Sequence, residues 1–290
     1  MASDGLDPRY FSDAPWADRV RDWVEDADSP FAAANEQVVR QVVASEDSGA
    51  RVVVNVGPTA LLQLLAGARY LNLYERPLVG GERQQPSATR RWVDETIGLT
   101  GADAYFAALA VGGAGVRFYG EYCLVLDVAA IDAQPSLFDR DSYELLAPPF
   151  AGRADLPELV GRLSASWDER HDVLVLKVLP GLTSTHRSVT SGTVADAVLS
   201  DQDFVEVHLT PDRTQHPTGC FTLDDVLEVR LSPVDVTLVA WLRSRREDGL
   251  PLSDEEALYL RQREDVQDRW SQDGPPRRVV GTGAGGYGWT

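Results

Sequence analysis

A glutamate inside an apolar strand is the side chain best placed to do chemistry. The segment from Asp203 to Leu209 alternates, so that Phe204, Glu206 and His208 share one face of a strand while apolar side chains share the other. Because the apolar face packs into a core, Glu206 is expected on the face that lines a cleft. A carboxylate there can stabilise a developing positive charge or orient a hydroxyl group. The alternative is a solvent-exposed strand glutamate.

Four short fragments, taken in order, resemble an ADP-ribosyltransferase-like pattern of a bacterial or phage-associated type. They span roughly residues 66–230. The fragments are Arg69–Glu75 followed by Gly80-Gly81, then Arg91–Glu95 with Gly98 close behind, then Phe118–Asp127 leading to Phe138–Ser142, and finally Asp203–His208 followed by Leu223–Val226.

The resemblance implies NAD as the substrate and no metal. Cleavage of the nicotinamide–ribose bond passes through an oxocarbenium-like state, which needs a carboxylate near the ribose, here Glu206. A bidentate arginine suits the pyrophosphate, and Arg69 has that position in the resembling region. Tyr119 or Tyr70 would pack on the nicotinamide ring. The simpler alternative for Arg69 is a surface arginine at a strand edge.

Three further residues fall within the same fragments, and the resemblance assigns them to cofactor binding: Asn72, Arg91 and Ser142. Each chemical role has a plainer competitor. Arg91 and Glu95 are four residues apart and can form an ion pair on a helix surface. Tyr119 can equally be a core tyrosine, and Ser142 an N-cap or turn residue.

Other kinds of site have little support in the sequence. The four histidines show no H-x-H or H-E-x-x-H spacing, so a metal site would have to be assembled in space. The hydroxyls of 183–185 are not accompanied by a G-x-S-x-G motif, which argues against a serine hydrolase. The G-x-G-x-x-G pattern at Gly281–Gly286 is expected to belong to a tail and not to a dinucleotide site, because no helix is expected after it.

The charge balance excludes whole classes of partner. A formal net charge of −18 repels nucleic-acid phosphates and anionic lipid, so neither generic nucleic-acid binding nor membrane binding is expected. A local basic pocket for a small phosphate-bearing ligand is compatible with that charge. Met1–Gly5 lacks the start of a secretory signal, and no apolar run approaches the ~20 residues of a membrane span. A cytoplasmic location is therefore expected, with export without a classical signal as the alternative.

Hydrophobic periodicity and turn residues predict the elements that must position these side chains. Helices are predicted around Trp16–Val24, and at Ala32–Ala44, Ala60–Ala66 with Thr59 as N-cap, Thr89–Ile97, Val236–Arg246, and Ser253–Trp270 with a capping box. Strands are predicted at Arg51–Val56, Arg69–Tyr74, Val116–Val128 with a bend at Gly120, Val173–Val178, Phe204–Leu209 and Val226–Leu231.

Strands without regular helical crossovers indicate an α+β fold. The resemblance specifies a mixed or antiparallel sheet core of ADP-ribosyltransferase-like type with N- and C-terminal helices. The expected organisation is an N-terminal helical segment (1–50), an α+β core (51–232), C-terminal helices (233–273) and a flexible tail (274–290).

The leading hypothesis is an NAD-dependent ADP-ribosyltransferase-like protein that transfers ADP-ribose to a protein or nucleic-acid acceptor. The alternative is a non-catalytic interaction or structural protein, phage- or defence-associated, on a degenerate version of the same scaffold. Its terminal helices would then be docking surfaces. A third hypothesis is a small-molecule enzyme that uses paired carboxylates, such as Glu121 and Glu206.

Overall fold

The computed structural model describes residues 11–46, 49–72, 74–76, 86–99, 104–183, 189–199, 203–270 and 274–280. Within these residues the strands form one sheet in the order β5-β4-β6-β2-β1-β3-β7-β8. All neighbouring strands are antiparallel except the parallel pair β7 and β8. The strands are β1 (Ala50–Val56), β2 (Tyr105–Val111), β3 (Tyr122–Leu126), β4 (Ala133–Phe138), β5 (Ser164–Ser166), β6 (Glu206–Pro211), β7 (Val226–Leu231) and β8 (Arg277–Val279).

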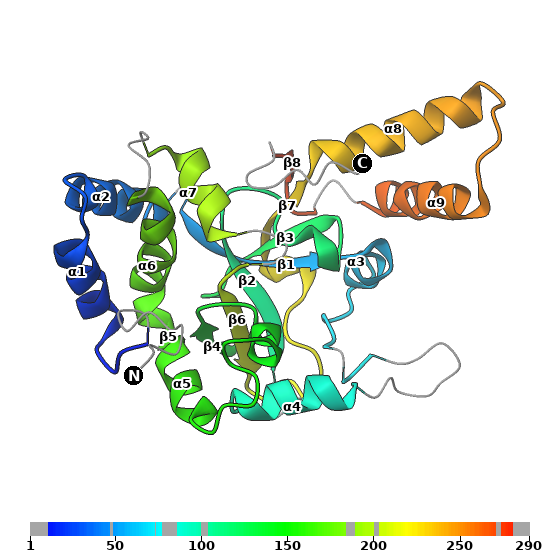
Figure 1. Ribbon diagram of the computed structural model, residues 1–290. Coiled ribbons are helices and arrows are strands. Elements are labelled where there is room, and N and C mark those ends of the chain that lie inside the picture. Colours follow the sequence, from blue (N-terminus) through cyan, green and yellow to red (C-terminus); the bar gives the residue numbers. More distant parts are fainter. Residues whose placement is uncertain are drawn as a thin grey trace.

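Helices surround this mixed sheet, which confirms the predicted α+β class (Figure 1). The α-helices are α1 (Trp16–Asp26), α2 (Ala32–Val43), α3 (Pro58–Leu65), α4 (Ala88–Thr96), α5 (Leu156–Leu163), α6 (Arg170–Thr183), α7 (Ser191–Val198), α8 (Pro233–Glu247) and α9 (Asp254–Arg269). The short 3-10 helices are η1 (Arg117–Tyr119), η2 (Ser142–Leu146), η3 (Trp167–Glu169) and η4 (Leu223–Asp225).

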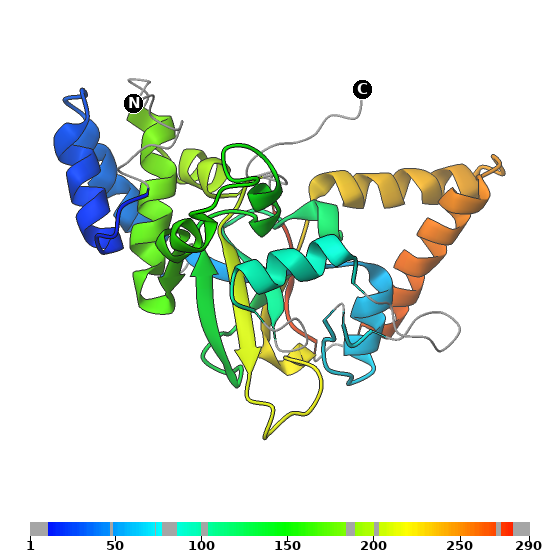
Figure 2. The same cartoon turned by 60° about the horizontal axis from the view of Figure 1, so that its bottom comes forward.

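The helices lie in separate groups around the sheet. Helices α1, α2, α6 and α7 pack together on one side, while α4 lies across the sheet away from them (Figure 2). Helices α8 and α9 form a hairpin that extends from the side opposite to α1 and α2, and α9 contacts α3 (Figures 1 and 2). None of the helices in the described part of the chain is long and apolar enough to cross a membrane.

The strand that carries Glu206 lies inside the sheet, between β4 and β2. Glu206 is paired with Phe138 on one neighbour and with Ala108 on the other. Val205, Val207 and Leu209 are fully buried in the main core, as predicted, and Phe204, Glu206 and His208 on the opposite face are buried as well. The sheet therefore fixes the backbone of Glu206 from both sides.

One predicted strand is wrong. Residues 173–178 belong to helix α6, whose apolar side chains from Val173 to Leu179 are almost completely buried. The helix packs against α1, α2 and α7, so it is apolar on most of its circumference. A continuous apolar run has the same sequence pattern in a buried strand and in a buried helix, and its valines favour a strand.

The stretch 69–74, predicted as a strand, is irregular in its described residues. Tyr70 exchanges two backbone hydrogen bonds with the 220–221 segment, at 2.7 and 2.9 Å. Beyond Tyr70 the chain turns, because the Asn72 side-chain oxygen accepts hydrogen bonds from the backbone N–H groups of Tyr74 and Glu75. This side-chain turn competes with strand pairing.

Most other predicted elements are confirmed near their predicted ends. The strand at 226–231 is β7, the first strand is β1, and the capping box of Ser253 and Glu256 starts α9. The predicted stretch 116–128 divides into η1 and β3 at Gly120, whose φ is +155°. Thr59 is not an N-cap, because α3 begins at Pro58. Strands β2 and β4 were not predicted, and β8 lies within the expected tail.

Candidate functional site

A pocket of about 280 Å³ opens beside Glu206, which is at the lower end of the range for small-molecule sites. Strands β1 and β2 contribute its floor, and the 70–76 segment, α4, η1 and η2 contribute its walls. The lining residues are Val53, Val54, Asn55, Val56, Gly57, Ala60, Tyr70, Asn72, Tyr74, Arg76, Arg90, Phe106, Ala107, Ala108, Val116, Tyr119, Tyr143, Phe204 and Glu206.

Glu206 is buried, with only 3% of its surface exposed, and both carboxylate oxygens are held. Oε2 accepts hydrogen bonds from the backbone N–H and the hydroxyl of Ser142, each at 3.0 Å. Oε1 lies 2.7 Å from Nε2 of His208, two residues further along the same strand face. The prediction that Glu206 faces a cleft agrees with this position, and a solvent-exposed glutamate does not.

The surroundings of Glu206 favour its charged form. Burial by itself raises the pKa of a carboxyl group, but the hydrogen bond from His208, the Arg90 guanidinium and the Ser142 N–H outweigh it. The pKa of Glu206 therefore lies below its ordinary value. An ionised carboxylate only accepts hydrogen bonds, so Nε2 of His208 carries the hydrogen. Three of the roughly four acceptor positions of the carboxylate are occupied, which leaves one for a ligand.

Arg90, on the first turn of α4, is the buried cation of the pocket. Its guanidinium pairs with Asp94 one turn later at 2.6 Å, and their side chains are 11% and 1% exposed. It also lies over the rings of Phe106 and Tyr143, at 3.9 and 5.1 Å from their centroids. Burial opposes the charge of Arg90, but Glu206 and Asp94 more than compensate and raise its pKa.

The pocket is rich in aromatic side chains. Tyr70 stacks on Phe221 with ring centroids 4.8 Å apart and planes 17° apart. Tyr119 is half exposed at the end of η1. Burial and the carboxylates of Asp141 and Glu206 raise the pKa of Tyr119, so its phenol stays protonated at neutral pH. These rings offer flat apolar surfaces at both the wall and the mouth of the pocket.

A second ion cluster fixes the pocket wall formed by residues 70–76. The Glu75 carboxylate accepts hydrogen bonds from Tyr105, from the backbone N–H of Asn72 at 3.2 Å and from the backbone N–H of Gly219 at 3.1 Å. Arg213 lies 3.2 Å from the same carboxylate. Glu75 therefore ties this wall to β2 and to the segment before β7.

The structure brings five of the seven predicted site residues together. Glu206, Tyr70, Asn72 and Tyr119 line the pocket, and Ser142 holds the Glu206 carboxylate. The Asn72 side chain is also structural, because it donates to the Ala104 carbonyl at 3.2 Å and accepts within its own turn.

Arg69 and Arg91 are not among the residues that line the pocket. The Arg69 guanidinium donates to the carbonyl of Cys220, and the aliphatic part of the side chain lies against Gly219. Arg91 is exposed on the outer face of α4. Their predicted roles in cofactor binding have no geometric support, and Arg90 and Arg76 are the cations that line the pocket.

Sequence reasoning missed three members of the site. Arg90 precedes Asp94 by four residues, so a helix ion pair was the available signal. His208 shares the strand face of Glu206, which was noted without assigning it a role. Tyr143 follows Ser142 directly, and no sequence pattern indicated that it lines the pocket.

The other hypotheses concern paired carboxylates, a metal site, a glycine-rich dinucleotide motif and a hydroxyl nucleophile. Glu121 pairs with Arg263 at the base of α8 and α9 and does not line the pocket of Glu206, so these two carboxylates do not share a site. No group of three or more potential metal-binding side chains occurs in the part of the chain that the structure describes. The glycine pattern at 281–286 and the hydroxyls at 184–185 lie outside the described residues.

Comparisons with known proteins leave the family open. No family model, curated protein or solved structure matches this chain. The resemblance to ADP-ribosyltransferase-like proteins thus remains an expectation drawn from four sequence fragments, and any function has to be argued from the site itself.

Proposed function

We propose that this chain binds NAD in the pocket beside Glu206 and transfers ADP-ribose to a macromolecular acceptor. The observation that carries the proposal is the Glu206 carboxylate: buried, held in its charged form by His208, Ser142 and Arg90, and facing a pocket lined by aromatic rings. A buried carboxylate that specific partners keep in its charged form beside a pocket is a candidate for function.

The proposed reaction uses this charge directly. The bond between the ribose C1′ and the nicotinamide nitrogen breaks, and nicotinamide leaves with the electron pair. Positive charge then develops on the ribose, as in glycoside cleavage, and Glu206 stabilises it. The acceptor's nucleophilic atom forms the new bond to C1′ and releases its proton. The free acceptor position on Glu206 suits a ribose hydroxyl.

The remaining lining residues have roles that fit the rest of NAD. Arg90 and Arg76 are the pocket's cations and would bind the pyrophosphate, which replaces the role first predicted for Arg69. Tyr119 offers an exposed ring face to the nicotinamide, whereas the Tyr70 ring is already covered by Phe221 and Arg76. The two arginines lie at different depths in the pocket: Arg90 is largely buried, and Arg76 is exposed.

The direct test is the release of nicotinamide from NAD by the full-length chain. Glu206→Gln keeps the shape of the side chain and its contacts with Ser142, but removes the negative charge. We expect the release to fall by about 10²–10³-fold, the usual loss when one transition-state charge contact is removed. Glu95→Gln, on the exposed face of α4, is the matched control and should release nicotinamide like the wild type. Equal release by the wild type and Glu206→Gln contradicts the role of Glu206.

One observation favours the non-catalytic alternative. Helix α8 exposes Val234, Leu238 and Trp241, which are 42%, 39% and 50% exposed and follow a helical stripe. Exposed apolar stripes with a tryptophan are typical of protein interfaces. Thermal melts with NAD separate the two functions, because a ligand present at about 100 times its Kd adds about 2.7 kcal/mol to the free energy of unfolding. No shift at millimolar NAD favours the interaction protein.

A further inference from the structure

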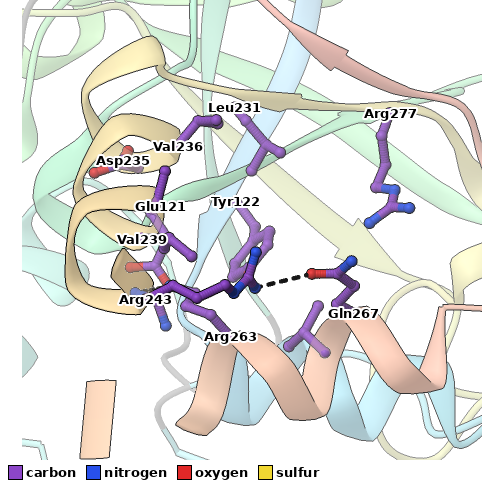
Figure 3. Close-up of a pocket in the computed structure, with 12 residues that line it drawn as sticks. Glu121, Tyr122, Leu231, Asp235, Val236, Val239, Arg243, Arg263, Gln267 and Arg277 are labelled. Atoms are coloured by element: carbon purple, nitrogen blue, oxygen red, sulfur yellow. Dashed lines mark hydrogen bonds and ion pairs between the residues drawn. The ribbon is translucent and has the colours of Figure 1, made fainter. Parts of the chain in front are cut away.

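A second pocket, of about 220 Å³, lies at the base of the hairpin formed by α8 and α9 (Figure 3). It shares no lining residue with the pocket of Glu206. Its apolar walls come from four elements, with Tyr122 on β3, Leu231 on β7, Val239 on α8 and Val266 on α9. The hairpin and the sheet edge therefore enclose an apolar space that neither would form alone.

The acidic residues of this pocket are already compensated. Glu121 pairs with Arg263 at 2.5 Å. Asp235 accepts two hydrogen bonds from Arg117, at 2.8 and 3.2 Å. Each of these two carboxylates is therefore already paired with an arginine.

Two of those arginines have weak partners or none. Arg243 lies 3.6 Å from Glu264, a carboxylate that Arg246 already binds through two hydrogen bonds at 2.7 and 2.8 Å. Arg243 also donates a long hydrogen bond of 3.4 Å to Gln267 (Figure 3). Arg277 lies 4.8 Å over the Trp270 ring and pairs with no carboxylate among the described residues.

Arg263 adds a buried, incompletely satisfied cation to the same pocket. Its side chain is 8% exposed, and it lies over the Tyr259 ring at 3.9 Å. Its Nε and Nη1 atoms are buried and have no hydrogen-bond partner among the described residues. Buried donors without an acceptor are costly and rare, so their presence beside a pocket points to an absent acceptor.

We propose that this pocket binds an organic anion with an oxyanion head and a flat apolar body. Arg243 and Arg277 donate to the head, the buried Arg263 adds positive charge beside it, and Val239 and the Tyr122 ring contact the body. Guanidinium groups bind carboxylates and phosphates with the same paired geometry, so the head can be either. The site is independent of the proposed NAD reaction.

The test is a ¹⁹F NMR titration of the full-length chain with three probes of one size. 4-Fluorophenylacetate and 4-fluorophenyl phosphate carry the two oxyanion heads, and 4-fluorophenylacetamide is the neutral control. We expect at least one anion to bind about tenfold more tightly than the amide or better, the effect of one or two charge-assisted hydrogen bonds. The tighter of the two anions identifies the head that the site prefers.

Variants then locate the binding. The double variant Arg243→Gln with Arg277→Gln is expected to weaken anion binding by about tenfold or more. Val239→Trp, which fills the pocket without changing a charge, should abolish it. Arg261→Gln with Arg269→Gln removes the same charge from the exposed face of α9 and should leave the affinity within about twofold, because distant surface charges are screened.

Three results overturn the proposal. They are no detectable binding of either anion at millimolar concentration, equal binding of the amide, and an equal loss in the Arg261 and Arg269 control. Glu206→Gln is expected to bind these probes like the wild type, and a loss there would place them in the first pocket instead. Unchanged melting temperatures of the variants show that lost binding is not lost folding.

Discussion

The ion pair between Arg90 and Asp94 gives the sharpest test of how the Glu206 pocket is built. Arg90→Met removes the cation and keeps most of the side-chain length. Asp94, which is 1% exposed, then loses its charge partner at 2.6 Å and keeps only the hydrogen bond from Tyr74. Breaking one side of a buried pair costs about 3–5 kcal/mol, and the lost contact with the Phe106 ring adds up to about 1 kcal/mol. With the Tyr74 bond retained, we expect a loss of about 3 kcal/mol in the free energy of unfolding.

A second substitution separates the charge effect from lost packing. In Arg90→Met with Asp94→Asn the buried charge is gone together with its partner. The double variant should therefore be more stable than Arg90→Met alone, by about 2 kcal/mol, because neutral replacement of a buried pair is often nearly neutral. Urea unfolding followed by circular dichroism measures the wild type, the single variants Arg90→Met and Asp94→Asn, and the double variant, provided that the m-values agree.

The neighbouring Arg91 is the matched control. It is exposed on the same helix turn, so Arg91→Met is expected to change the stability by about 0.5 kcal/mol or less. If Arg90→Met and Arg91→Met unfold at the same urea concentration, Arg90 is not the buried cation of the pocket. If the double variant loses the sum of the two single losses, the pair is not coupled and the reasoning about its charge is refuted.

Three further predictions concern residues around the same pocket. Ser142→Ala removes one of the three hydrogen bonds to Glu206 and should raise the pKa of that carboxyl, which ¹³C NMR titration of the side chain measures; an unchanged pKa contradicts the assigned contact. Because the folded-state pKa of Glu206 is lowered, its charge adds stability that is present above the unfolded value of about 4.3 and is lost as the pH falls through the lower folded value. The stability difference between the wild type and Glu206→Gln should accordingly shrink below about pH 4 in urea unfolding series, and a difference that grows there has the wrong sign. Gly120→Ala would place a Cβ 2.2 Å from the Val56 carbonyl carbon and should lower the melting temperature by several degrees, whereas Gly161→Ala in α5, with nothing within 4 Å, should not lower it.

The position of Glu206 was predictable because a strand has a strict two-residue period. Once Val205, Val207 and Leu209 are assigned to the core, Glu206 and His208 must share the opposite face. The hydrogen bond between these two side chains was the part that alternation could not supply, because it depends on side-chain rotamers. The Ser142 contact depends on η2, whose first residue lies 64 residues away from Glu206 in sequence.

The choice between Arg90 and Arg91 shows where a sequence resemblance fails. Successive residues of a helix point about 100° apart, so only one of two adjacent arginines can face the pocket. Val93 and Asp94 are the buried residues of α4, and Arg90 lies one turn before Asp94 on the same face. Arg91 lies one turn before the exposed Glu95. The helical periodicity of the sequence therefore indicated that Arg90 is on the buried face of α4. The resembling fragment starts at Arg91 and does not include Arg90.

Helix α6 could not be distinguished from a strand on local grounds. Its residues from Val173 to Leu179 are buried because α1, α2 and α7 pack against this helix, and α1 and α2 come from the N-terminal part of the chain, more than 120 residues away in sequence. Lys177 is the polar exception, and its side chain reaches Asp203 at 2.5 Å. A single lysine in an otherwise apolar run does not reveal a period of 3.6.

The net charge of −18 repels anionic ligands, and this applies to the proposed ligands of both pockets. An anionic ligand must meet uncompensated cations, although carboxylates are abundant. Arg76 over the Tyr70 ring at 5.3 Å and Arg277 over the Trp270 ring at 4.8 Å are held by aromatic faces, which orient a guanidinium without neutralising it. At 0.1 M salt the Debye length is about 10 Å, so a small ligand in contact with such an arginine is screened from most of the distant negative charge. A long polyanion would not be screened in this way, because its other phosphates would lie close to further carboxylates of the chain. The small anions proposed for the two pockets are therefore compatible with the net charge of −18.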